Sequence, residues 1–157
     1  TENDCRDLLL DKLSARLAPL NVLVEREKSE ARDKRADMSA EIMQAGKQIA
    51  LPIEVKKDNH DKLWTAWNEQ LIQLYAIDPA ASGYGLYLVL WFNVRPQAFV
   101  SGAKSKGFAH LKPRASPEGI KPTSAQVLQR MIEERIPTQD RSRLAVKVMD
   151  MSLPSQP

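Results

Sequence analysis

A continuous apolar run near the middle of the chain, residues 84–92, limits the fold more than any other segment. It reads Tyr-Gly-Leu-Tyr-Leu-Val-Leu-Trp-Phe, without alternation of polar and apolar residues. A strand with one solvated face alternates, whereas a strand covered on both faces does not. The run is far shorter than the roughly 20 apolar residues that cross a bilayer, so no membrane partner is expected. It predicts an internal strand with helices on both sides.

A β-hairpin is expected before this strand. Residues 37–43 and 48–56 read as its two arms, joined by a turn over 44–47. Gly46 in that turn can adopt the positive φ that tight hairpin connections often need. A further strand is expected over 21–25, which would complete a three-stranded antiparallel meander.

Helices are expected on either side of these strands. Leucines at helical spacing mark a helix over 4–17, and an apolar stripe marks another over 62–75. Ser124 is a suitable N-cap for a third helix over 124–135, and a last strand is expected over 143–149. This order predicts the α/β (α+β) class: a mixed central β-sheet with a three-stranded antiparallel meander, flanked by helices.

The length and composition suit one domain. A chain of 157 residues with 43% apolar residues can bury a core of its own. We expect a single domain over 1–157, with a core at about 2–92, a basic loop at 93–123, and a C-terminal helix and strand at 124–150.

Two further features bear on the setting of the protein. The chain opens on Thr1, so we expect a domain excised from a larger polypeptide. Cys5 is the only cysteine, which excludes an internal disulfide and a zinc cluster built on cysteines. A single cysteine favours a reducing, cytoplasmic location.

Three polar residues of the hairpin carry the chemistry that we expect. Side chains alternate across a strand, so Glu54 and Lys56 share one face, about 7 Å apart along it. If the hairpin turns near Gly46, Asp37 lies beside Glu54 in the antiparallel register. Two carboxylates can bind Mg²⁺, and a lysine can orient the attacking water. The alternative is that an acid and a lysine two positions apart are only a solvated strand face.

At these residues the chain resembles the PD-(D/E)XK nuclease superfamily, whose shared core is helix, three-stranded meander, helix and strand. The matching segments are residues 35–38, Arg-Ala-Asp-Met, and 51–57, Leu-Pro-Ile-Glu-Val-Lys-Lys. The resemblance covers roughly residues 2–92. Ala36 stands where the family has a proline, which removes no ligand.

The resemblance implies a restriction-endonuclease-like fold and a site. Asp37 and Glu54 would bind Mg²⁺ or Mn²⁺, the Val55 carbonyl would add a ligand, and Lys56 would position the hydrolytic water. Members of the superfamily often place another metal-side acid where the first helix begins, which here implies Glu2. An acid at a helix start also complements the helix dipole without any catalytic role, and this stays the alternative.

Gln70 resembles the glutamine of the Gln-x-x-x-Tyr signature in one branch of the superfamily. The resemblance implies a catalytic role for Gln70, although Tyr75 follows it by five positions rather than four. An exposed polar residue on a helix is the alternative.

Several residues could contact nucleic acid. His60 follows the Glu-Val-Lys segment and could touch a phosphate, or be an ordinary surface histidine. The loop over 93–123 has six basic residues against Glu118, a local charge of +5. Such a loop would hold a phosphate backbone without reading sequence, or be merely solvated. The basic residues are Arg95, Lys104, Lys106, Lys112, Arg114 and Lys121. The tryptophans at 64, 67 and 91 could stack on bases, but their spacing favours core positions.

These features predict a Mg²⁺-dependent phosphodiesterase that acts on DNA, with RNA as the alternative substrate, as a module of a larger bacterial or defence-type protein. The net charge of +3 and pI near 9.0 are compatible with nucleic-acid binding. The rival is a catalytically inactive nucleic-acid- or protein-binding module of the same fold. A third reading is a structural domain that oligomerises its parent, and a homodimer is compatible with the sequence.

Overall fold

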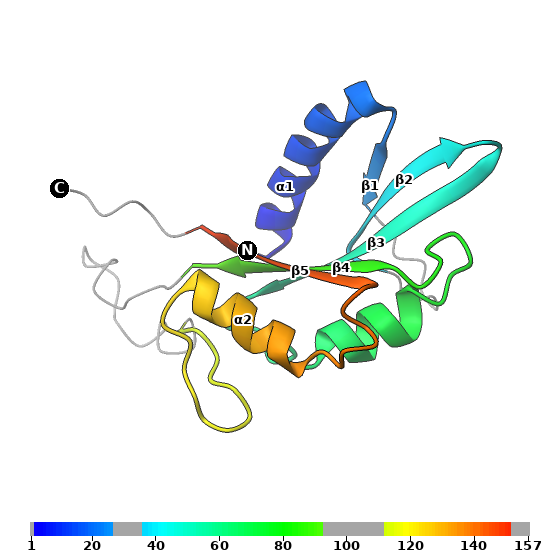
Figure 1. The fold of residues 1–157 in the computed structure, drawn as a ribbon. Helices are drawn as coiled ribbons and strands as arrows, with labels where there is room; N and C mark the ends of the chain where they lie inside the picture. Colours follow the sequence, from blue (N-terminus) through cyan, green and yellow to red (C-terminus); the bar gives the residue numbers. More distant parts are fainter. Residues whose placement is uncertain (1, 27–35, 93–111, 152–157) are drawn as a thin grey trace, which may run out of the picture.

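The protein is a five-stranded mixed sheet with helices on both faces (Figure 1). The computed structural model describes residues 2–26, 36–92 and 112–151, with side chains described from Arg6 onward. The strands lie in the order β1-β2-β3-β4-β5. Their bounds are β1 Leu23–Arg26, β2 Met38–Gln44, β3 Lys47–Lys57, β4 Gly85–Trp91 and β5 Leu144–Asp150.

Antiparallel pairing joins the first three strands, whereas β4 is parallel to β3 and β5 is parallel to β4. The predicted α+β class with a mixed sheet is confirmed. The sheet as a whole is a five-stranded mixed sheet, not a three-stranded meander, because the antiparallel part ends at β3 and β5 extends the parallel part.

Helices lie on both faces of the sheet. Their bounds are α1 Glu2–Leu17, the short 3-10 helix η1 Ala18–Leu20, the π-helix η2 Trp67–Tyr75 and α2 Ala125–Arg135. Figure 1 shows α1 on one side of the sheet, with α2 and the green helix η2 on the other. None of the helices in the described part of the chain is long and apolar enough to span a bilayer.

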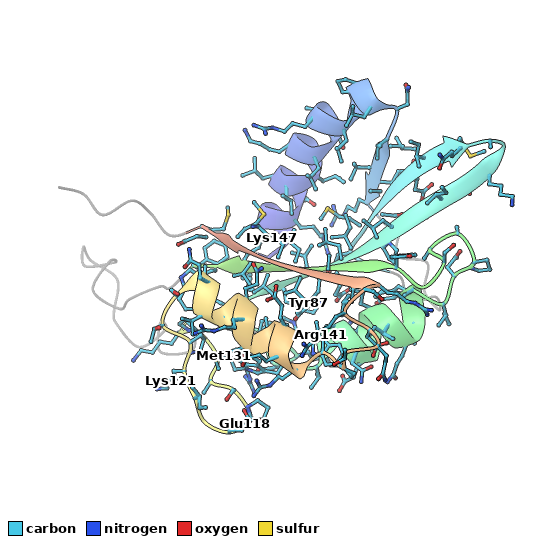
Figure 2. All side chains as sticks on the ribbon, in the orientation of Figure 1. Tyr87, Glu118, Lys121, Met131, Arg141 and Lys147 are labelled. Carbon is cyan, nitrogen blue, oxygen red and sulfur yellow. The ribbon has the colours of Figure 1, made fainter. Side chains whose placement is uncertain are left out.

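Strand β4 separates two apolar clusters, as its unbroken apolar sequence predicts. Its even-numbered residues Leu88 and Leu90 pack with Ile53 and Val55 of β3 on the side of α1. Its odd-numbered residues pack on the side of η2 and α2. That larger cluster includes Tyr87, Val89, Trp91, Leu63, Leu71, Leu128 and Ile132. Figure 2 shows Tyr87 between the sheet and α2, and the partly buried Met131 of α2 packs against this cluster.

The hairpin turn sets the β2–β3 register. Ala45 and Gly46 form a two-residue connection with φ values of 50° and 76°, both in the left-handed region. Two such residues make the turn type whose twist matches the flanking strands. The resulting register pairs Met38 with Ile53. The expected turn over 44–47 is therefore shorter by one residue on each side.

The helix expected over 62–75 begins later and has a different hydrogen-bond pattern. Residues 61–65 form turns, and the helix proper runs over Trp67–Tyr75 as a π-helix. Trp67, Leu71 and Tyr75, four positions apart, all stay buried against the sheet. Apolar spacing predicts such a stripe but not the wider turns, because residues four apart share a face in either helix type.

The close approach of η2 to β4 depends on a glycine. A methyl group at Gly85 would lie 2.8 Å from Leu71 Cγ and 2.9 Å from its Cδ1. Leu71 is fully buried, so its side chain has little room to move. Only glycine allows this helix and strand to pack at their observed distance.

We therefore expect Gly85→Ala to lower the free energy of unfolding by about 1–3 kcal/mol through overpacking. Leu71→Ala alone should cost about 2–5 kcal/mol. The double variant should be less destabilised than the sum of the two, because the smaller residue 71 leaves room for the methyl group. Urea denaturation measures all three.

Gly46→Ala is the control, since nothing lies within 4 Å of a methyl group there. It should cost only about 1 kcal/mol, from its positive φ. Strict additivity in the Gly85/Leu71 double variant would contradict the packing account.

Candidate active site at the end of β3

The candidate site forms where β2 and β3 separate. Met38 and Ile53 are paired, and Asp37 immediately precedes β2. Beyond this pair, the amide of Val55 points toward β2 without a ladder partner from that strand. The Asp37 carboxylate takes that place, since Val55 N–H donates to Asp37 Oδ2 at 2.9 Å. The acid thus ends the ladder and is held beside β3.

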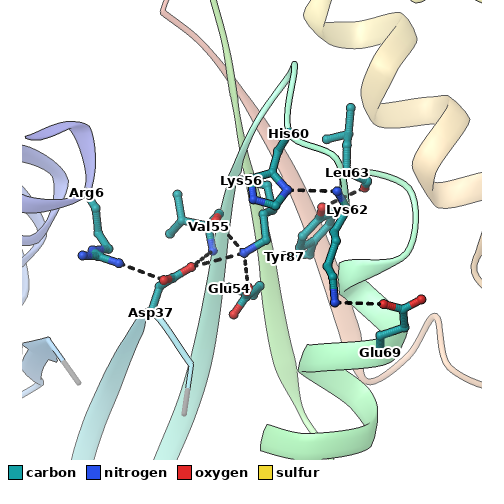
Figure 3. A network of polar contacts seen from close by, with 10 residues as sticks. All are labelled: Arg6, Asp37, Glu54, Val55, Lys56, His60, Lys62, Leu63, Glu69 and Tyr87. Atoms are coloured by element: carbon teal, nitrogen blue, oxygen red, sulfur yellow. Dashed lines mark hydrogen bonds and ion pairs between the residues drawn. The ribbon is translucent and has the colours of Figure 1, made fainter. Parts of the chain in front are cut away.

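Lys56 brings the predicted residues together (Figure 3). Its Nζ donates to Glu54 Oε1 and, at 3.2 Å, to the Val55 carbonyl oxygen. The same Nζ lies 3.7 Å from Asp37 Oδ2. The ammonium is therefore surrounded by two carboxylates and a backbone carbonyl, and the side-by-side placement predicted for Asp37 and Glu54 follows from the hairpin register.

The site is buried although it is charged. Glu54 is 2% exposed and Lys56 is 5% exposed. Both side chains lie on the η2 face of β3, where Glu54 pairs with Tyr87 of β4 and Lys56 pairs with Val89. Burying a lone charge costs several kcal/mol, so each of these two charges depends on the other. A solvated strand face, the alternative reading of this pattern, does not describe them.

Arg6 of α1 is a site residue that the sequence did not identify. Its Nη1 donates to Asp37 Oδ1 at 2.9 Å, opposite the side that faces β3 (Figure 3). The side chains of Arg6 and Asp37 are 16% and 19% exposed. The signal in the sequence was a basic residue one turn before Leu9 and Leu10 and two turns before Leu13, the leucines that pack on the sheet.

The donor set fits a hard divalent ion. Within 2–26, 36–92 and 112–151, no three His, Cys, Asp or Glu side chains form a metal-binding group. Asp37, Glu54 and the Val55 carbonyl are the oxygens available around Lys56 Nζ. Mg²⁺ is commonly bound by one or two carboxylates and keeps several waters, so this small set is adequate for it.

The described part of the structure does not join the other two predicted catalytic or metal-binding residues, Glu2 and Gln70, to this group. Glu2 begins α1, but its side chain lies outside the described residues. Gln70 lies on η2, half-buried, with its Oε1 buried and without a hydrogen-bond partner in the described structure. No hydrogen bond between described residues joins Gln70 to Asp37, Glu54 or Lys56. The expected catalytic roles of Glu2 and Gln70 stay predictions.

His60 lies in the turn after β3 and is drawn with the site residues in Figure 3. Its Nδ1 accepts a hydrogen bond from Lys62 N–H at 2.9 Å. This bond stabilises the local chain reversal. A phosphate contact by His60 stays a prediction.

The described part of the basic loop is attached to the same end of β3. Arg114 N–H donates to the Asp58 carbonyl at 2.7 Å, and its guanidinium pairs with Asp61. Asp58 is itself buried and accepts Phe92 N–H at 2.9 Å. Lys112 and Arg114 are exposed, whereas Lys104 and Lys106 lie outside the described residues. The tryptophans at 64, 67 and 91 are buried core residues, not base-stacking ones.

Glu118 has a shifted pKa in this loop, away from the site. A hydrogen bond from the Ser116 side chain, backed by the backbone and the Arg135 guanidinium, holds the pKa of Glu118 below its usual value. Because the pKa of Glu118 is lower in the folded than in the unfolded protein, its carboxylate stabilises the fold above the unfolded-state pKa. This contribution is lost as the pH falls through the lowered pKa. Arg135 also lies 4.9 Å from the ring centroid of Trp64.

No family model, curated protein or solved structure matches this chain. Any function assigned to it therefore has to be supported by its own residues. Those residues are the two carboxylates, the carbonyl and the two cations described above.

The pairing of Glu54 and Lys56 can be tested through stability. Lys56→Met should lower the free energy of unfolding by about 3 kcal/mol, because it removes the ammonium from a buried carboxylate. The double variant Glu54→Gln/Lys56→Met should regain most of that loss. Urea denaturation in a metal-free buffer measures the coupling between the two positions.

Lys62→Met is the matched control, since Lys62 pairs with Glu69 at the surface. An exposed pair contributes about 0–1 kcal/mol, so this variant should be nearly neutral. A Lys56→Met variant that is equally neutral would mean that the buried pair is not formed.

Proposed function

We propose that this chain is a Mg²⁺-dependent nuclease domain that hydrolyses phosphodiester bonds of DNA. The observation that carries the proposal is the meeting of Asp37, Glu54 and the Val55 carbonyl around one buried ammonium. These oxygens already surround one cation, the Lys56 ammonium. Mn²⁺ is the alternative to Mg²⁺ as the bound metal. The proposal includes a cytoplasmic setting and a place in a larger bacterial or defence-type protein.

The order of elements supports a restriction-endonuclease-like fold. Helix α1, three antiparallel strands, helix η2 and the parallel strand β4 follow one another as in the shared core of the PD-(D/E)XK superfamily. The residues that carry the resemblance lie together in this order, with Asp37 just before β2 and Glu54 and Lys56 on β3.

The residues have separate tasks in the proposed reaction. A bound Mg²⁺ would supply Lewis-acid polarisation of the scissile phosphate. Asp37, Glu54 and the Val55 carbonyl would hold it. Lys56 would orient the attacking water and donate to a phosphate oxygen as negative charge grows on it. The water oxygen bonds to phosphorus, the bond to the leaving sugar oxygen breaks, and that oxygen gains a proton while the water loses one.

The basic residues would hold the substrate. Lys112 and Arg114 are exposed on the segment that is hydrogen-bonded to the end of β3, and His60 lies in the turn beside it. Lys104 and Lys106 lie outside the described residues, and their contact with DNA stays a prediction from the basic segment of the sequence. Contacts to phosphates position a backbone without reading bases, so this surface supports a sequence-tolerant nuclease.

Cleavage of plasmid or oligonucleotide DNA with Mg²⁺ or Mn²⁺ tests the proposal. Asp37→Ala and Lys56→Ala should each lower the rate by about a hundredfold or more, since each removes a group that acts on the developing charge. Lys62→Ala, an exposed lysine near the site, is the matched control and should retain activity. Unchanged cleavage in both site variants would remove the catalytic assignment.

The rival function is a binding module of the same fold that does not cleave. It predicts DNA binding that weakens with salt and needs no metal. Removal of a phosphate-contacting residue, as in Arg114→Ala, should reduce the slope of log affinity against log salt concentration by about one. Calorimetry with Mn²⁺ separates the two functions. A nuclease site should bind the ion and lose it in Glu54→Ala, whereas the binding module should show no heat in either protein.

A further inference from the structure

Asp37 is held from two sides by cations and an amide. Oδ1 accepts from Arg6 Nη1 at 2.9 Å, and Oδ2 accepts from Val55 N–H at 2.9 Å and lies 3.7 Å from Lys56 Nζ. Both partners of the Arg6–Asp37 pair are more than four-fifths buried. Solvent therefore screens this interaction much less than an exposed ion pair.

The formal charges of the site already cancel. Asp37 and Glu54 contribute −2, and Arg6 and Lys56 contribute +2, so the four side chains sum to zero. A divalent ion placed among the same oxygens would raise the sum to +2 in a largely buried space. The entry of the ion is therefore opposed unless one of the resident cations moves away.

Arg6 is the cation that can move. Lys56 is 5% exposed and lies on a strand that is paired on both sides. Arg6 lies on α1, in which no residue from Arg6 to Leu17 is fully buried. Because Arg6 belongs to the helix and not to the sheet, displacing its side chain leaves the strand pairing intact, whereas moving Lys56 would uncover the buried Glu54.

We propose that Arg6 is a positioning residue that competes with the divalent ion for Asp37 Oδ1. Without metal, the guanidinium neutralises Asp37 and fixes its carboxylate against β3. Metal binding exchanges this ion pair for a metal–carboxylate bond, so Arg6 keeps the metal affinity below what the oxygens alone would give. The proposal rests on the proposed function, since it requires a divalent ion at Asp37.

Mn²⁺ titration of the whole chain by calorimetry, without DNA, tests the competition. Arg6→Gln should bind Mn²⁺ about tenfold more tightly than the wild type, since a charge-assisted hydrogen bond to the ligand no longer has to break. A merely structural Arg6 would change affinity in the opposite direction, because losing it would loosen Asp37. Arg6→Lys should give a smaller gain, since an ammonium lacks the guanidinium fork.

Arg26→Gln is the matched control. Arg26 pairs with Asp7 of α1 at 3.1 Å, with both side chains about half exposed. The variant removes the same charge near the same helix but does not touch Asp37. It should leave the affinity for Mn²⁺ unchanged. If Arg26→Gln raised the affinity as much as Arg6→Gln, the effect would come from net charge alone, and the proposal would be overturned.

The outcomes separate the competition from the proposed function. If the wild type binds Mn²⁺ and Arg6→Gln binds it equally or more weakly, the competition is wrong and the metal site stands. If neither protein binds Mn²⁺, both are wrong. If Arg6→Gln does not fold by circular dichroism, Arg6→Lys decides: a several-fold gain supports the competition, and unchanged affinity contradicts it.

Discussion

The buried ammonium of Lys56 is the interaction on which the candidate site depends. It lies against Glu54, the Val55 carbonyl and Asp37, in a layer that is otherwise apolar. Charges taken out of water are tolerated only when they are paired and hydrogen-bonded. Glu54 pairs this ammonium, and the hairpin register adds a second acid, Asp37, by bringing the start of β2 beside the end of β3.

The separation of β2 from β3 gives Asp37 two roles. As a structural group it accepts the amide of Val55 where the ladder stops. As a chemical group it faces Lys56 on one side and Arg6 on the other. The site thus has contributions from α1, from the residue before β2 and from β3, and Tyr87 of β4 lies opposite Glu54 in the neighbouring strand.

Local patterns predict the parts of this arrangement that depend on short-range geometry. The period of two along a strand puts Glu54 and Lys56 on one face, and a turn at Gly46 sets the register that brings Asp37 beside them. The unbroken apolar sequence of β4 likewise predicts that it is covered on both faces. Each of these inferences needs only the strand repeat and one turn.

The remaining features depend on how elements meet, which a local pattern does not contain. Arg6 reaches Asp37 because of the way α1 lies across the sheet, and a basic residue beside a leucine stripe does not specify that angle. An apolar stripe with residues four apart is compatible with an α-helix and also with the π-helix η2. The sequence therefore does not distinguish the two. The attachment of Arg114 to the end of β3 uses the backbone of Asp58, which carries no residue-type signal.

The central claim, that these oxygens form one cation site, is tested most directly by anomalous diffraction from crystals grown with Mn²⁺. The account predicts a single strong peak at about 2.2 Å from carboxylate oxygens of Asp37 and Glu54 and from the Val55 carbonyl, with the Arg6 guanidinium displaced from Asp37 Oδ1 and Lys56 still beside Glu54. A peak bound elsewhere, or no peak while Arg6 stays on Asp37 Oδ1, would contradict it.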